Sequence, residues 1–445
     1  MKYSYYLFLI LCVLFASQSF AQKPAIKKTI IRNVNVISID PSKPMMAQQQ
    51  DVIIIHGIIK KIKAASNGKY KGYEIVDGTG KYLIPGLADM HVHLPNENSV
   101  FQNREFQLMN LLSGVTTMRQ MRGKYADLEL RESIRNGSIL GCNMYVSTPF
   151  YRNGKTFSAT ECRDSLVKYK QQGYDFVKYL YGLSYAQYDT LVSVASSLHM
   201  KVVGHAPKND LQKAVAANQL TIEHIDPFLA LYKKDSNLFW KVIDTMVNKH
   251  LYTLPNLEWY VATGSQTSLE TKRSYYERNA YGISFMPKDS LDALILAYTN
   301  QDIDFFKKDP VAFAKDVLYD SEMMATYKHL LGKMHQRGVQ FLISATSGDF
   351  ILPGYNCIDE MNLFAKAGIA PYDILKCATC NAAACMEESS KWGTITENKR
   401  ADMVLLTANP LEDINNLRKV DATIINGNVL SHDYLLQELK KHYPN

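Results

Sequence analysis

The sequence has little of three features, each of which would indicate a particular class of protein: long apolar runs, long basic runs and cysteine. No stretch after the first residues is long and apolar enough to cross a bilayer. No long run of Lys and Arg occurs, although the formal net charge is +7, so the charge indicates an ordinary solvated surface and not a nucleic-acid interface. These absences exclude a membrane span and a nucleic-acid partner. They leave a small molecule as the expected binding partner and say nothing of the oligomeric state.

Cysteine is also scarce. The chain has seven cysteines, and Cys377 and Cys380 form a Cys-x-x-Cys pair in an Ala-rich stretch that we expect to be helical. A redox or zinc site would need a second pair or a suitable strand-helix context, and neither is present. We therefore expect small buried core residues at these positions.

The first residues have the pattern of a secretory leader. Lys2 supplies a positive charge, residues 6–15 are apolar, and Ser19-Phe20-Ala21 is a small-x-small cleavage site. We therefore predict a signal peptide over 1–21, and a soluble mature protein that is periplasmic or secreted.

The remaining chain alternates between strand-like and helix-like segments. Both ends are rich in short strands, and between them eight apolar segments alternate with helical ones, starting at 87, 115, 143, 176, 201, 221, 252 and 340. This pattern predicts an α/β fold, a (β/α)8 TIM barrel with a small β-sandwich built from both termini. The expected parts are the sandwich at 22–85 and 391–430, the barrel at 86–390 and a C-terminal tail at 431–445. The long aromatic segment 258–338 serves either to cap the barrel mouth or only to pack against it.

The most informative motif is a pair of histidines near the start of the predicted barrel. His91 and His93 alternate with apolar residues on a predicted strand, which places both on one face. Two imidazoles at i and i+2 on a strand can bind one divalent metal. Alone, the motif is weak.

Three further polar residues lie on or at the ends of later predicted strands. They are Lys178, His205 and His224. Active sites of barrels lie at the carboxyl ends of the strands. Any one of these histidines is explained by packing, but four converging on one face are not, since buried imidazoles need partners. A lysine there could extend to the rim, pair with a carboxylate, or react with CO2 to become an anionic metal ligand.

Together these motifs resemble the amidohydrolase superfamily, in its imidazolonepropionase-like and dipeptidase-like branch. The resemblance rests on Pro85-Gly86-Leu87-Ala88-Asp89-x-His91-x-His93, Gly114-Val115-Thr116-Thr117-Met118-Arg119, Gly173-x-Asp175-Phe176-x-Lys178, the two single histidines, Ala378-Thr379-x-Asn381-Ala382-Ala383, and Gly393 through Asn409-Pro410-Leu411.

The resemblance implies a metal-dependent hydrolase of C–N bonds with one or two divalent ions, expected to be zinc. His91 and His93 would hold one ion, His205 and His224 the other, and a carboxylated Lys178 would bridge them. A metal-bound hydroxide would attack an amide, cyclic amide or dipeptide-like bond. Imidazolonepropionase itself does not fit, because that activity belongs to cytosolic histidine breakdown and an exported chain is expected here.

One departure from the family pattern affects catalysis. The family's eighth strand ends in Gly-Thr-Asp, and that aspartate binds the first metal and accepts the proton of the attacking water. In this chain Thr346 occupies its position, and threonine is neither a base nor a good ligand. Asp349 follows three residues later, where extended backbone would turn it to the opposite face, roughly 10 Å further along. A bulge or turn at Gly348 would be needed to return it to the metal.

Three hypotheses follow from these residues. The first is an exported amidohydrolase in which Asp349 serves as the base or the metals act without it. The second is a catalytically degenerate relative, defined by Thr346, that binds a small molecule or a partner. The third is a mononuclear hydrolase that uses only some of the ligands. In each, Arg119 and Tyr181 are either contacts for a substrate carboxylate or structural residues of the barrel rim.

Overall fold

The computed structural model describes residues 27–96, 102–149, 151–152, 157–264, 288–289, 292, 310–348 and 351–441. The predicted leader, residues 1–21, and Asp349 lie outside these ranges. Among the described residues, no helix combines the length and the hydropathy that crossing a membrane requires.

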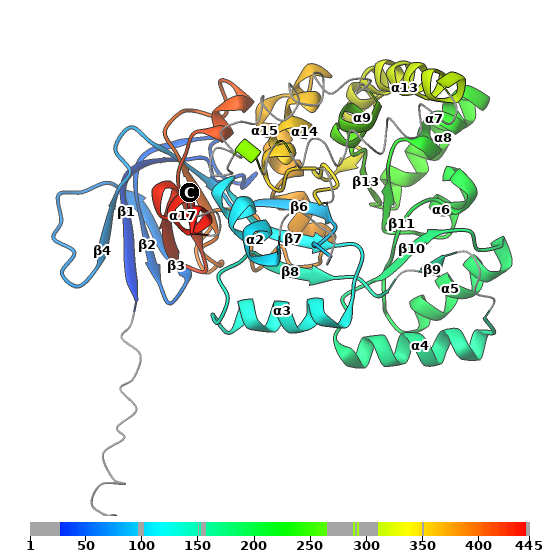
Figure 1. Cartoon of the computed structure of the whole chain (residues 1–445). Coiled ribbons are helices and arrows are strands. Elements are labelled where there is room, and N and C mark those ends of the chain that lie inside the picture. The colour runs from blue at the N-terminus through cyan, green and yellow to red at the C-terminus, as the bar shows by residue number, and fades with distance from the viewer. Residues whose placement is uncertain are drawn as a thin grey trace, which may run out of the picture.

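Strands from both ends of the chain form one eight-stranded sheet, shown at the left of Figure 1. Its order is β17-β16-β15-β5-β1-β2-β3, and β4 pairs with β1. The bounds are β1 Lys28–Val36, β2 Ala47–Ile55, β3 Ile58–Ala64, β4 Glu74–Asp77, β5 Tyr82–Pro85, β15 Met403–Leu406, β16 Val420–Ile425 and β17 Asn428–Ser431. The predicted hairpin is confirmed, because β2 and β3 pair antiparallel through His56 and Gly57. Both turn residues have positive φ, 52° and 74°, as a tight hairpin turn requires.

The middle of the chain forms two parallel sheets, of order β6-β7-β8 and β14-β13-β12-β11-β10-β9. Parallel bridges from Ser147 to Phe176 and from Val92 to Ser347 join segments of one sheet to segments of the other. The bounds are β6 Leu87–Val92, β7 Val115–Gln120, β8 Asn143–Val146, β9 Tyr151–Arg152, β10 Val177–Tyr181, β11 Val202–Gly204, β12 Thr221–Glu223, β13 Tyr252–Leu254 and β14 Gln340–Phe341. Each of the eight apolar segments predicted from the sequence overlaps one of these strands, and the short β9 was not predicted.

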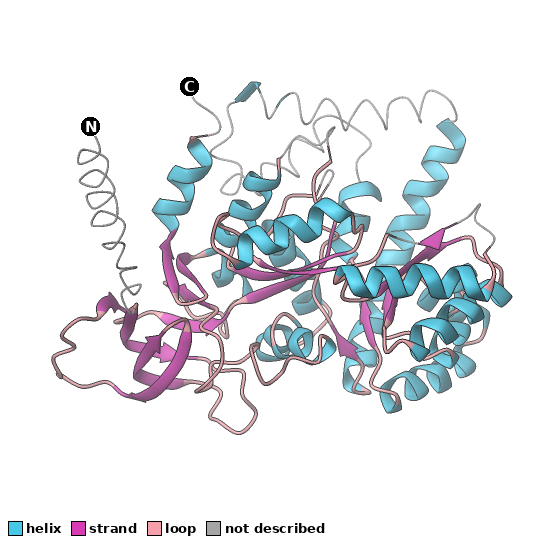
Figure 2. Cartoon of the chain, turned by 90° about the horizontal axis from the view of Figure 1, so that it is seen from below, coloured by secondary structure: helices cyan, strands magenta, loops and turns pink. Residues whose placement is uncertain are grey.

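Helices alternate with the parallel strands and lie around them (Figures 1 and 2). They are α2 Asn103–Leu112, α3 Tyr125–Arg135, α4 Ala159–Gln172, α5 Tyr185–Ser197, α6 Leu211–Ala216, α7 Asp226–Lys234, α8 Ser236–Asn248, α9 Leu257–Gly264, α13 Pro310–Gln336, α14 Tyr355–Lys366, α15 Pro371–Cys377 and α16 Cys380–Cys385. A further helix, α17 His432–Lys440, follows β17 and packs against α2 and the eight-stranded sheet. The sequence predicted a tail after 430, whereas most of it is α17, which buries Leu435 and Leu439. The six described cysteines are free, and Cys377 and Cys380 lie at a break between α15 and α16.

Candidate active site

Four imidazoles gather where the parallel strands end. The ring centroids lie 5.1 Å apart for His91 and His93, 5.4 Å for His91 and His224, and 4.7 Å for His205 and His224. His91 lies on β6, with His93 just beyond it, and His205 and His224 directly follow β11 and β12. β6 belongs to one parallel sheet and β11 and β12 to the other, and the Val92–Ser347 and Ser147–Phe176 bridges join the two sheets. Residues distant in sequence thus meet where strands of both sheets end, and all four histidines lie there.

The histidines line one cavity of about 660 Å³ together with Lys178 from β10. The structure therefore brings the five predicted ligand residues together. Other residues of the wall are Arg122, Asp226, Trp259, Tyr260 and Thr346. The cavity is large enough for a small molecule.

One wall of the cavity is held by a buried carboxylate. Glu360 on α14 accepts the backbone N–H of Leu257 at 3.0 Å and that of Glu258 at 2.7 Å. These N–H groups begin α9, whose free N-terminal donors need such a partner. Burial raises the pKa of Glu360 to about 8. The contact fixes the helix that places Trp259 and Tyr260 at the cavity.

Burial sets the charge state of the histidines. It lowers the pKa of His91 to about 3 and that of His224 to about 4. It also holds the pKa of His93 and of His205 well below the usual value. The rings are therefore neutral at physiological pH, which is the state that binds a metal.

Lys178 is the one lysine among the described residues of the cavity wall. Its side chain is 1% exposed, and its Nζ has no hydrogen-bond partner among the described residues. Burial lowers its pKa to about 8. An unpartnered buried ammonium is unfavourable, so the position suits a neutral amine or a modified lysine that gains a partner.

Space for this lysine depends on the absence of a side chain at Gly204. A Cβ there would lie 2.1 Å from the Tyr179 carbonyl oxygen and 3.0 Å from Cδ of Lys178, and φ is +119°. We expect Gly204→Ala to lower the free energy of unfolding by about 2–5 kcal/mol through backbone strain and overpacking. It should also displace Lys178. Urea unfolding measures the first effect.

Gly137→Ala is the matched control for this substitution. Gly137 has φ +80°, but a Cβ there meets nothing within 4 Å, so the control isolates the conformational penalty of about 1–2 kcal/mol. Equal losses in the two variants would contradict the close fit of Gly204 against Lys178.

Sequence reasoning missed a buried charge network behind the cavity. Glu223 on β12 is fully buried; its Oε2 lies 2.7 Å from Nδ1 of His91, and its Oε1 accepts from Nη2 of Arg119 at 2.9 Å. Thr221 Oγ1 also donates to Oε1, at 2.6 Å. Burial alone raises the pKa of Glu223, but Arg119 and His91 outweigh it and hold that pKa well below its usual value. Glu223 is thus a carboxylate that orients the His91 ring.

The two predicted substrate contacts lie elsewhere. Arg119 is fully buried, its Nε donates to the Met90 carbonyl at 2.7 Å, and its guanidinium pairs with Glu223. This position does not fit a contact with substrate; it fits a structural residue that supports Glu223. Tyr181 is 53% exposed at the end of β10 and is not part of the cavity wall.

Thr346 lines the cavity in a strained conformation. Its φ is +61°, which is a genuine outlier for a β-branched residue. Its Oγ1 is buried and has no hydrogen-bond partner among the described residues. Position 346 therefore faces the site, as the alignment with the family pattern predicts.

A buried aspartate fixes this strained loop. Asp89 on β6 accepts from Ser344 Oγ at 2.6 Å and from Ser347 Oγ. Ser344 Oγ in turn accepts the backbone N–H of Thr346 at 3.0 Å. Because residues on both sides of Thr346 are anchored, the surrounding contacts hold its backbone in the strained conformation.

The donor set fits a metal in part. Among the described residues, no three His, Cys, Asp or Glu side chains form a ready metal-binding group. The predicted ligands are two histidine pairs and a lysine. An ion held by one pair would therefore have only two of the predicted ligands unless Lys178 supplied a third. The Nε2 atoms of His91 and His93 lie 3.2 Å apart, close to the spacing of about 3.3 Å between two nitrogen ligands of one tetrahedral zinc. Nζ of Lys178, which has no hydrogen-bond partner among the described residues, belongs to the same cavity and is the remaining candidate donor.

A comparison by sequence agrees with the cavity and with the histidines and the lysine that line it. The model of the amidohydrolase family matches residues 82–430. The chain belongs to the amidohydrolase family.

Individual relatives of this amidohydrolase are distant. The adenine deaminase of Oceanobacillus iheyensis is 27% identical over 233 residues, which cover 49% of this chain and 34% of that protein. The dihydroorotase of Carboxydothermus hydrogenoformans is 42% identical over 64 residues, 14% of each chain. The chain thus spans well under half the length of these relatives.

Solved structures share the fold over nearly the whole chain. A structure described as a Xaa-Pro dipeptidase with bound methionine in the active site has a TM-score of 0.67 and 18% identity, covering 91% of this chain and all of that one. Bottromycin amidohydrolase has a TM-score of 0.71 and 18% identity, covering 94% and 91%. At these identities the likeness establishes the fold alone.

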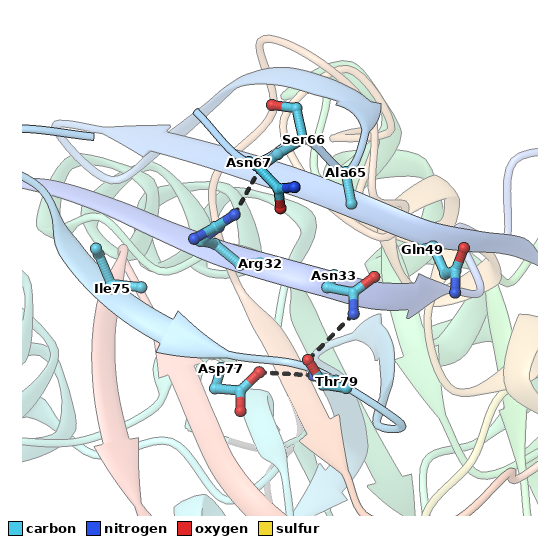
Figure 3. Close-up of a pocket in the computed structure, with 9 residues that line it drawn as sticks. All are labelled: Arg32, Asn33, Gln49, Ala65, Ser66, Asn67, Ile75, Asp77 and Thr79. Atoms are coloured by element: carbon cyan, nitrogen blue, oxygen red, sulfur yellow. Dashed lines mark hydrogen bonds between the residues drawn. The ribbon is translucent and has the colours of Figure 1, made fainter. Parts of the chain in front are cut away.

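A second cavity, of about 600 Å³, lies on the eight-stranded sheet of this amidohydrolase (Figure 3). Its charged groups bond locally: Arg32 Nη2 donates to the Ser66 carbonyl at 2.6 Å, and Asp77 Oδ1 accepts from the Thr79 N–H at 3.0 Å. None of the predicted site residues lines it. The chemistry predicted from the sequence is therefore confined to the histidine cavity.

Proposed function

We propose that this chain is an exported, metal-dependent hydrolase of C–N bonds that acts on an amide, cyclic amide or dipeptide-like substrate. The observation that carries the proposal is the convergence of four buried neutral imidazoles and Lys178 on one cavity. Family membership supports the reaction class, and the leader-like residues 1–21 support export.

We propose that the parallel strands close into a (β/α)8 barrel with the cavity at its carboxyl-terminal end. The bridges Ser147–Phe176 and Val92–Ser347 support closure at both seams. The eight-stranded sheet from the two termini corresponds to the proposed sandwich. Barrel active sites lie at that end, which agrees with the position of the histidines.

We propose His91, His93, His205 and His224 as metal ligands, with zinc as the expected ion. A bound divalent ion lowers the pKa of water toward neutrality and polarises a carbonyl. The chain supplies the rest: Glu223 accepts a hydrogen bond from Nδ1–H of His91 and so holds the ring with Nε2 toward the cavity. The wall formed by Trp259 and Tyr260 limits the space around a substrate.

Carboxylation of Lys178 is part of this proposal. The neutral amine attacks the carbon of CO2, an N–C bond forms, and one proton leaves, which yields a carbamate anion. The pKa of about 8, lowered by burial, makes the neutral amine accessible near physiological pH. The carbamate would supply the anionic ligand that the histidine pairs lack.

Chelation and reconstitution test the function. The mature chain should hydrolyse at least one member of a panel comprising a Xaa-Pro dipeptide such as Met-Pro, adenine and dihydroorotate. A chelator should abolish turnover, and added zinc should restore it. Turnover that survives complete metal removal would contradict the proposal.

Thr346 favours a second candidate, a degenerate relative that binds a small molecule without turnover. Loss of a general base costs about 10²–10⁴ in rate, whereas the cavity and its cation-binding residues remain. This candidate predicts saturable binding of a panel member, measured by calorimetry, with no product formed.

A further inference from the structure

The two histidine pairs of the cavity are not equivalent, and the difference lies in the second nitrogen of each ring. A spacing of 3.2 Å between Nε2 of His91 and Nε2 of His93 suits two ligands of one ion. It equally suits an N–H···N hydrogen bond between the rings. The partners of the two Nδ1 atoms decide which arrangement the protein favours.

His91 is held ready for a metal. Its Nδ1 lies 2.7 Å from Oε2 of Glu223, whose Oε1 accepts hydrogen bonds from Arg119 and Thr221. A carboxylate only accepts hydrogen bonds, so Nδ1 carries the proton and Nε2 presents a lone pair.

His93 is held in the opposite state. Its Nδ1 lies 3.1 Å from Nη2 of Arg122. A guanidinium only donates, so Nδ1 of His93 accepts and its proton resides on Nε2. That proton points to His91 Nε2, and the three contacts form one consistent hydrogen-bonded chain from Arg122 to Glu223.

A metal on this pair would need the Nε2 lone pair of His93. The proton would then move to Nδ1, where it would face the N–H of Arg122, or Arg122 would have to leave. The guanidinium also adds a fixed positive charge beside the ion. Thr346 offers no anionic ligand on this side.

The other pair meets no such obstacle. Nζ of Lys178 and Nδ1 of His205 are buried without a hydrogen-bond partner among the described residues. The His205 and His224 rings are 4.7 Å apart. Among the described residues, no hydrogen bond of Lys178 Nζ or His205 Nδ1 has to break before an ion is bound.

We propose that Arg122 opposes metal binding at His91 and His93, so that the protein holds one tightly bound ion, at His205, His224 and Lys178. This inference rests on the proposed metal site and specifies its occupancy. Arg122 is thus a specificity-determining residue for metal content.

Zinc titration against a chromophoric chelator, with zinc counted by mass spectrometry, tests the inference on the mature chain. Wild type should bind one zinc per chain tightly. Arg122→Met should bind a second with affinity raised about 10–100-fold, the range typical of changes to groups that contact a ligand. Arg135→Met, which alters an exposed arginine paired with Glu132, should match wild type.

Two ligand variants give a result that does not depend on the folding of Arg122→Met. His93→Ala should keep the tight zinc, and His205→Ala should lose it. A wild type that binds two ions of equal affinity, or an Arg122→Met variant that binds as wild type does, overturns this inference and leaves the proposed function standing. A folded wild type that binds no zinc overturns the proposed function and this inference with it.

Discussion

Replacing Thr346 by aspartate is expected to raise turnover of a panel substrate by about 10²–10⁴, the usual contribution of a positioned general base. The reason is geometric. Thr346 lines the cavity, and the Asp89–Ser344 and Asp89–Ser347 contacts anchor its loop, so a carboxylate at 346 would face the same space. Steady-state kcat on the panel measures the effect.

Thr346→Asn is the matched control, because it has the shape of aspartate without a base. Both variants relieve strain, since Asn and Asp tolerate positive φ better than Thr, and both should unfold at slightly higher urea concentration. Only Thr346→Asp should gain turnover. Equal activity of the two variants, or wild-type turnover that Asp349→Ala abolishes, would contradict a missing base at position 346.

Removing Glu223 is expected to have the largest effect on stability. Glu223→Ala leaves the Arg119 guanidinium, which is fully buried, without its counter-charge. Breaking a buried pair in this way typically costs about 3–5 kcal/mol. The free energy of unfolding from urea titration should fall by that amount.

A double variant separates charge loss from cavity formation. Arg119→Met with Glu223→Gln removes both charges, and it should be more stable than Glu223→Ala because no unpaired charge remains. A Glu223→Ala protein as stable as wild type would show that Arg119 and Glu223 are not coupled.

Much of the fold was predictable because the strands are apolar runs bounded by turn residues. The segments at 115–121 and 221–225 predicted β7 and β12 within two residues. Asn398 has φ +70°, the left-handed conformation that asparagine tolerates better than most residues. The helix expected across 374–386 breaks at Thr379, which periodicity does not reveal.

The five predicted ligand residues were identifiable because they end apolar strands, where imidazoles and amines have few structural uses. Glu223 was missed because it directly precedes His224, so strand alternation places the two side chains on opposite faces and no motif singles out the first. A signal existed: Glu223 and Arg119 are opposite charges in two buried strands, and such charges must pair. The strain at Thr346 is held by contacts between β6 and residues 344–347, which are distant in sequence, so no local pattern could predict it.

Anomalous diffraction at the zinc edge, from crystals of the mature protein prepared with zinc, tests the central claim most directly. The account predicts a zinc peak in the cavity, about 2.0–2.1 Å from ring nitrogens of His205 and His224. A cavity without a peak, or zinc bound only elsewhere on the chain, would contradict it.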